Sequence, residues 1–292
     1  MPVRGPFACP AGRWQSGETP CSDRGEGVGR MASGVPVLLV HGARTSRTMW
    51  RRQLQVLDGA GVTAVAVDLP GHGRRIDEPF TLDGSVDAIH DGVDGLGGRA
   101  LVVGLSLGGY LAIEHRARYP EQSAGLVAAS CCTPPQSPLR GLWQSASHAL
   151  ESRPDHGAWL NDWLTAHTLD DAAAADITAG GYALTVMTDV LRELAPSDTL
   201  SALARGTSPV WLVNGRWDHF RGGERRMVAA ARSGGAPLRL VVVPGARHTV
   251  SFDAPVAFAR VVLEAAAAVS PTSRAAAPTL APRPREPLSS AR

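Results

Sequence analysis

Residues 102–109 read Val-Val-Gly-Leu-Ser-Leu-Gly-Gly, and this stretch decides how the chain folds. The apolar run at its start predicts a buried strand, and residues 107–119 after the serine predict a helix. A Gly-x-Ser-x-Gly turn between a strand and a helix holds its serine in a strained conformation, so small residues are needed two positions before and after it. Gly104 and Gly108 occupy those positions. We therefore expect the Ser106 hydroxyl to project at a helix N-terminus, where backbone N–H groups can receive negative charge.

Outward from this turn, strand and helix signals alternate along the chain. Helical spacing is found, for example, at 50–61, 107–119 and 221–233. Runs rich in β-branched residues predict buried parallel strands at 36–40, 62–67, 100–103, 125–130, 209–213 and 238–243. The alternation predicts an α/β fold with a mostly parallel central sheet flanked by helices, and ligands bound outside the carboxyl ends of the strands.

One interval interrupts this rhythm. Residues 133–205 contain no strand signal, but apolar residues recur at helical spacing in three groups within 139–150, 159–164 and 184–194. Three amphipathic helices between two strands predict a small helical cap inserted at about 133–205. Its tryptophans, Trp143 among them, either pack the cap on the core or line a substrate pocket.

The two ends of the chain have a different composition. Residues 1–34 and 271–292 are rich in Gly, Pro, Ala, Arg and Ser and have no periodicity, which predicts a flexible N-terminal extension and a disordered C-terminal tail. The α/β domain is therefore expected at 35–270. Met31 precedes the first strand closely, so translation starting at Met31 is a hypothesis for the natural N-terminus.

Composition excludes several classes of function. The net charge is +2 and no basic run carries interleaved aromatic residues, so we expect no nucleic-acid partner. The apolar runs are too short to span a bilayer and no secretory h-region is present, so we expect no membrane partner and a cytoplasmic location. The 29 basic residues are all arginine, which excludes lysine chemistry such as a Schiff base. Adjacent Cys131 and Cys132 are expected to be small buried residues.

A nucleophilic serine needs a base, and the base needs an acid that orients it. Asp218 follows the run 209–213, and His248 follows the run 238–243 in a short loop that contains a glycine. Both side chains are therefore expected at the same sheet edge as Ser106. An acid after the strand that ends at Ser130 would serve equally well, but no carboxylate occurs at 130–133. Ser106, Asp218 and His248 are the predicted catalytic residues.

An anionic intermediate also needs hydrogen-bond donors. The backbone N–H of Leu107, directly after the serine, is one candidate, and the N–H of Ala43 in the loop His41-Gly42-Ala43-Arg44 is the other. His41 and His72 are expected to brace loops rather than to catalyse. Arg44 and Arg74 at the pocket mouth would favour an acidic substrate, an alternative that the residues leave open. No metal-ligand cluster and no dinucleotide motif is present in the sequence, so we expect neither a metal nor a cofactor.

Taken together, these motifs resemble the α/β-hydrolase superfamily in its cap-bearing branch, over about residues 36–268. The segments that carry the resemblance are HGARTSRTMW at 41–50, DLPGHG at 68–73, GLSLGG at 104–109, NGRWD at 214–218 and GARHTVSFDAP at 245–255. The resemblance implies a Ser–Asp–His triad, an oxyanion hole at Ala43 and Leu107, and no cofactor. The compact subset with methylesterases and hydroxynitrile lyases is the most similar.

Departures from the pattern of that family reduce the number of reactions that the chain is expected to catalyse. The lyases place a lysine beside the catalytic histidine, where this chain has Thr249, so cyanohydrin cleavage by that route is disfavoured. Ser106 in place of an aspartate disfavours epoxide hydrolase and haloalkane dehalogenase chemistry. The sequence thus predicts a serine hydrolase that cleaves a small or medium carboxylic ester. A lyase or carbon–carbon hydrolase with the same triad, or a non-catalytic receptor, is the alternative.

Overall fold

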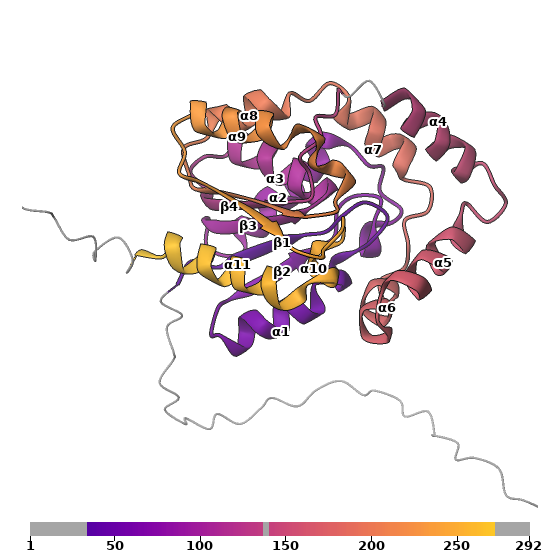
Figure 1. Cartoon of the computed structure of the whole chain (residues 1–292), viewed down its shortest axis with the longest axis horizontal. Helices are drawn as coiled ribbons and strands as arrows, with labels where there is room; N and C mark the ends of the chain where they lie inside the picture. Colours follow the sequence, from indigo (N-terminus) through magenta and orange to yellow (C-terminus); the bar gives the residue numbers. More distant parts are fainter. Residues whose placement is uncertain (1–33, 137–139, 272–292) are drawn as a thin grey trace, which may run out of the picture. The chain divides into compact units, whose positions relative to one another are not determined.

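Six parallel strands form one sheet in the order β2-β1-β3-β4-β5-β6 in the computed structural model, which describes residues 34–136 and 140–271 (Figure 1). Their bounds are β1 Val37–Val40, β2 Ala64–Val67, β3 Ala100–Leu105, β4 Ser123–Ala129, β5 Val210–Gly215 and β6 Leu238–Val243. Every pairing between these strands is parallel. The predicted fold class is therefore confirmed, and each expected strand is present within a few residues of its expected bounds.

Successive residues of the central strands face two different hydrophobic cores. Leu38 and Val40 of β1 lie in one core, and Val37 and Leu39 lie in the other. All four are fully buried. A strand covered on both faces needs apolar side chains at every position, which explains why these strands are continuous apolar runs rather than alternating ones.

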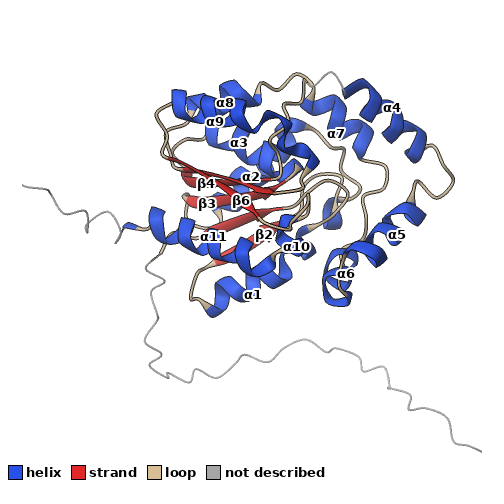
Figure 2. Ribbon diagram, in the orientation of Figure 1, coloured by secondary structure: helices blue, strands red, loops and turns tan. Residues whose placement is uncertain are grey.

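Helices cover both faces of this sheet (Figure 2). On one face lie α1 Arg51–Gly59 and α11 Pro255–Val269, which pack on each other. On the other lie α2 Leu82–Asp94, α3 Leu107–Arg118 and α9 Glu224–Ser233. The short α10 Val250–Asp253 precedes α11, and short 3-10 helices span Arg47–Trp50, Gly73–Arg75 and His219–Gly223.

The described residues between β4 and β5 form five helices where the sequence predicted three. They are α4 Arg140–Glu151, α5 Ala158–Thr168, α6 Asp171–Thr178, α7 Met187–Leu194 and α8 Thr199–Arg205. Helix α6 is alanine-rich and α8 has seven residues, so neither has a long apolar stripe. Helix α8 packs on α3 and α9 and so belongs to the layer that covers the sheet. The remaining four helices lie at one side of that layer, and α7 contacts α2 (Figure 1).

The predicted N-terminal extension, the start at Met31 and the predicted C-terminal tail fall almost entirely on residues 1–33 and 272–292, which lie outside the described residues. No helix in the described ranges is long and apolar enough to cross a membrane.

Candidate active site

Ser106 occupies the sharp turn between β3 and α3, with φ +52° and ψ −115°. A side chain at Gly104 would place its Cβ 2.1 Å from the carbonyl oxygen of Gly108, and one at Gly108 would lie 2.3 Å from the carbonyl oxygen of Val40. Both glycines are thus required by close backbone approaches, as expected for this turn. The turn places Ser106 at the carboxyl end of β3, before the first residue of α3.

Three side chains from three different loops form one hydrogen-bonded chain at this edge of the sheet. Nε2 of His248 lies 3.0 Å from Oγ of Ser106, and Nδ1 of His248 lies 3.0 Å from Oδ1 of Asp218. With Nδ1 donating to the carboxylate, Nε2 is free to accept the serine proton. The structure therefore brings together the three residues that the sequence selected, while their catalytic roles stay a prediction.

Asp218 is held in place by burial and by a hydrogen bond in addition to the one with His248. Its side chain is fully buried, and Oδ1 also accepts a hydrogen bond of 2.8 Å from the backbone N–H of Phe220. Burial acts to raise the pKa of Asp218, but hydrogen bonds and the charge of His248 outweigh it, so that the pKa lies below its ordinary value. The carboxyl is therefore ionised at neutral pH and can stabilise a histidine cation.

Gly215 makes the contact between the loops of Asp218 and His248 possible. A Cβ at Gly215 would lie 2.1 Å from the carbonyl oxygen of Arg247 and 2.5 Å from that of Ala246. Sequence reasoning did not single out this residue. The available signal was a glycine at the end of a strand, three residues before the predicted acid.

The loop after β1 carries Ala43, the second expected oxyanion donor, and two buried histidines hold it. His41 accepts a hydrogen bond of 3.1 Å from the N–H of Leu69 at Nε2, so its Nδ1 carries the proton and donates to the carbonyl of Gly42 at 2.8 Å. His72 accepts from the N–H of Arg44 at 3.3 Å. Both histidines brace loops, as the sequence predicted, and burial lowers the pKa of His41 to about 3.

Leu107 is the first residue of α3, and the first N–H groups of a helix have no acceptor within it. Ala43 and Leu107 line the same cavity as Ser106. The arrangement is compatible with an oxyanion hole at these two residues, which stays a prediction.

A cavity of about 460 Å³ opens above Ser106 and His248. Helix α7 lines it with Met187, Val190, Leu191 and Leu194, one apolar face at helical spacing. Further walls come from the residues Met49, Leu105, Tyr110, Pro134, Pro135, Trp143, Ile177 and Phe252. Among the described residues that line this cavity, none carries a carboxylate or guanidinium group.

The arginines considered at the pocket mouth do not line this cavity. Arg44 has φ +62° and directs Nη2 toward the carbonyl of His156, 3.5 Å away. The backbone N–H of Arg74 donates to Asp68 at 3.2 Å. The expectation of an acidic substrate held by these two arginines is therefore not supported by their positions.

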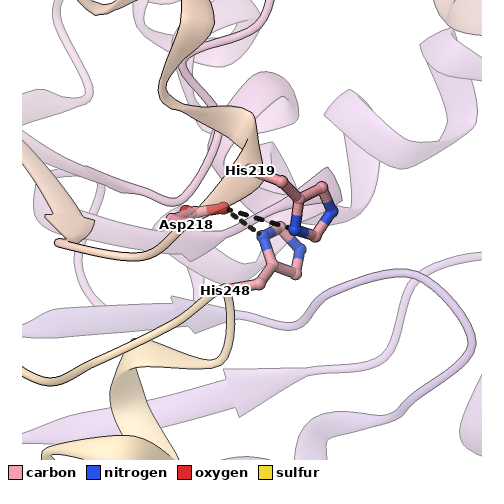
Figure 3. A group of neighbouring side chains, drawn as sticks. All are labelled: Asp218, His219 and His248. Atoms are coloured by element: carbon pink, nitrogen blue, oxygen red, sulfur yellow. Dashed lines mark hydrogen bonds and ion pairs between the residues drawn. The ribbon is translucent and has the colours of Figure 1, made fainter.

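Next to the acid lies His219, whose side chain is more than half exposed (Figure 3). Its Nδ1 is 4.0 Å from Oδ1 of Asp218, and its ring centroid is 5.0 Å from that of His248. Asp218, His219 and His248 offer ligand atoms within 4.8 Å of one another, as in a metal site. Since Oδ1 of Asp218 already accepts from His248, the hydrogen-bonded chain to Ser106 accounts for the geometry of this group.

Comparison with known proteins agrees with this architecture. The family model described as "Alpha/beta hydrolase family" matches residues 37–261. The chain belongs to this family. Membership of this family supports the prediction that the protein is a hydrolase, and the predicted superfamily is confirmed.

Individual relatives resemble parts of the chain. Epoxide hydrolase B of Mycobacterium tuberculosis is 33% identical over 102 residues, which are 33% of this chain and 29% of the relative. Lipase LipV of the same organism is 38% identical over 93 residues, 31% of this chain and 35% of the lipase. These matches therefore span about a third of the length of either relative.

Solved structures resemble a larger part of the chain. A thermophilic esterase from Thermogutta terrifontis has 22% sequence identity and a TM-score of 0.65, over 81% of this chain and 91% of the esterase. At this identity the likeness bears on the fold alone.

Proposed function

We propose that this protein is a serine hydrolase that cleaves uncharged carboxylic esters through an acyl-enzyme. The observation that carries the proposal is the hydrogen-bonded chain Ser106–His248–Asp218, whose serine lines a largely apolar cavity. A serine within 3.0 Å of an imidazole nitrogen, with the second nitrogen bonded to a buried carboxylate, is the arrangement that activates a hydroxyl.

The reaction would run in two halves. His248 takes the proton of Ser106 as the hydroxyl attacks the ester carbonyl, and Asp218 stabilises the histidine cation. The N–H groups of Leu107 and Ala43 bind the negatively charged oxygen, and His248 then gives its proton to the leaving alcohol. Water attacks the acyl-enzyme by the same steps and releases the carboxylic acid.

The cavity supports the choice of substrate. Its volume of about 460 Å³ lies at the lower end of the range of roughly 300–1,000 Å³ that small-molecule sites have, which fits a small or medium ester. An anionic acyl group would lose its hydration there without gaining an arginine partner, because the described residues that line the walls include no carboxylate or guanidinium group. We propose that helices α4 to α7 act as the cap that encloses the substrate.

The names of the relatives include esterase, lipase and epoxide hydrolase. Ser106 favours the first two activities, because a serine attack on an ester leaves an acyl-enzyme that water hydrolyses readily. A lyase with the same three residues would form no acyl-enzyme, so detection of that intermediate separates the two reactions.

The test is a chain-length series of p-nitrophenyl esters, from acetate to decanoate, with the wild-type protein and Ser106→Ala. We expect hydrolysis by the wild type, a burst of p-nitrophenol, and an acyl mass on the peptide that contains Ser106. We expect Ser106→Ala to lose at least about 10³-fold in kcat with an unchanged Tm. Ser233→Ala, at the exposed end of α9, is the control and retains activity. Turnover that survives Ser106→Ala would remove the serine from the mechanism.

A further inference from the structure

Ser130 follows β4 directly and has an unusual backbone conformation. Its φ is +54°, in the left-handed region that only four non-glycine residues occupy within the described part of the chain; Ser106 is another. Its backbone N–H donates to the carbonyl of Val213 at 2.9 Å, so Ser130 lies beside the end of β5. A serine in this region strains the backbone, and such strain is often found at functional positions, which directs attention to its side chain.

The loop that follows Ser130 is joined to the loop that contains the catalytic acid. The N–H of Gly223 donates to the carbonyl of Cys132 at 2.7 Å. The hydroxyl of Thr133 donates to the carbonyl of Phe220 at 3.0 Å. These bonds hold the residues after β4 against the residues after β5.

Two buried polar atoms are left unpaired at this junction. Neither Oγ of Ser130 nor Oδ2 of Asp218 has a hydrogen-bond partner among the described residues. Ser130 is fully buried, as is the side chain of Asp218. Burial acts to raise the pKa of Asp218, and the nearby Ser130 side chain is among the groups that lower it. A buried carboxylate oxygen without a donor has lost its hydration, so a hydroxyl that rotates toward it would stabilise it.

We propose that Ser130 is a positioning residue, whose hydroxyl donates to Oδ2 of Asp218 while Oδ1 accepts from His248. The proposal rests on the proposed function, because it assigns Ser130 a part in the same hydrogen-bonded chain. A donor on Oδ2 draws negative charge away from Oδ1 and therefore weakens the stabilisation of a His248 cation. Ser130 thus sets how much of the carboxylate charge acts on the catalytic base.

Other ionisable groups lie near the pair, and those other than His219 keep one charge state between about pH 5 and 9. They are His219 in the same loop, Cys131 and Cys132 after β4, Tyr110 on α3, and Arg221, which pairs with Glu224. Burial raises the pKa of both thiols and of the Tyr110 phenol, so these groups stay neutral. Hydrogen bonding to Glu224 raises the pKa of Arg221, so it stays charged. Burial lowers the pKa of His219, and NMR resolves the titration of its ring from that of His248.

The test measures the imidazole titration of His248 by NMR in the full chain, and the acid limb of kcat/KM, for wild type, Ser130→Ala and Ser130→Gly. Both variants lack the hydroxyl, whereas only Ser130→Gly relieves the backbone strain. We expect both midpoints to rise by about 0.5–1 pH unit in both variants, since a hydrogen bond to a charged group is lost. Ser251→Ala removes another buried serine hydroxyl without a partner and serves as the matched control, with no shift expected.

An unchanged midpoint in both Ser130 variants would overturn the proposal. A shift in Ser130→Ala but not in Ser130→Gly would overturn it as well, because backbone strain would then be the cause. If Ser130→Ala fails to fold, Ser130→Cys, with its weak thiol donor, decides: a smaller upward shift supports the role and no shift refutes it. If the wild type hydrolyses no ester, the proposed function fails, while the NMR titration still tests the Ser130 contact.

Discussion

Nε2 of His248 lies 3.0 Å from Oγ of Ser106, within hydrogen-bonding distance. The proposed base is thus aligned with the proposed nucleophile. This alignment depends on the hydrogen bond between Nδ1 of His248 and Oδ1 of Asp218. Such alignment of base and nucleophile lowers the entropy that a reaction must overcome.

Loss of the charge on Asp218 should damage turnover far more than binding. Asp218→Asn keeps an oxygen that the N–H of Phe220 can reach, but it no longer stabilises the histidine cation or its tautomer. We expect kcat for a p-nitrophenyl ester to fall by about 10³–10⁴-fold with KM nearly unchanged. Asp170→Asn, at the start of α6, is the matched control and keeps full activity. Activity above a tenth of wild type would show that Asp218 is not the orienting acid.

The turn that holds Ser106 should not tolerate a methyl group at Gly108. Because a Cβ there would lie 2.3 Å from the carbonyl oxygen of Val40, Gly108→Ala must displace β1 or α3. We expect the free energy of unfolding to fall by about 3 kcal/mol and ester hydrolysis to be lost. Gly59→Ala, at the end of α1, meets nothing within 4 Å and should be neutral or slightly stabilising. Urea unfolding measures both variants, and equal stability for the two would contradict the close approach.

The apolar face of α7 should set the preference for acyl chain length. Leu191 lines the cavity and is half-buried, so Leu191→Asp introduces a charge without disrupting the core. We expect kcat/KM to fall at least about tenfold for the hexanoate ester and less for the acetate, because only the longer chain contacts α7. Arg192→Ala, on the exposed side of the same helix, should change neither value. An equal loss for both esters would show that Leu191 does not contact the acyl chain.

Stability should fall in mild acid because His41 is buried in its neutral form. Burial, followed by the charge of His72, lowers its pKa from 6.5 to about 3 in the folded state. Between these values the unfolded chain binds a proton at His41 that the folded chain does not bind. The contribution of His41 to the free energy of unfolding is therefore fully present above pH 6.5 and declines as pH falls toward 3. We expect about 2 kcal/mol of loss between pH 7 and pH 5 from this residue.

Urea unfolding at the two pH values measures this effect. His41→Gln should lose less stability than the wild type between pH 7 and pH 5, although it is less stable at pH 7. His167→Gln, at an exposed position, should keep the wild-type pH dependence. The same pH dependence in His41→Gln as in the wild type would mean that His41 is not the source.

Much of the fold was predictable because its signals are local. A strand buried on both faces needs an unbroken apolar run, and the turn at Ser106 needs glycine two positions to either side. The helices between β4 and β5 were predicted less well. Helix α6 consists largely of alanine, whose helix propensity is high but which leaves no apolar stripe to detect.

The functional site was likewise predictable only in part from the sequence. The sequence by itself determined which residues could carry the chemistry, since Ser106, Asp218 and His248 each follow a strand and parallel strands end at one edge of a sheet. Only the tertiary structure decided which loops touch. Three features depend on contacts between segments far apart in the chain. They are the close approach at Gly215, the Ser130 hydroxyl without a partner among the described residues, and the largely apolar walls that those residues give the cavity. Such contacts follow from the packing of strands and loops in space, which no local pattern of residues encodes.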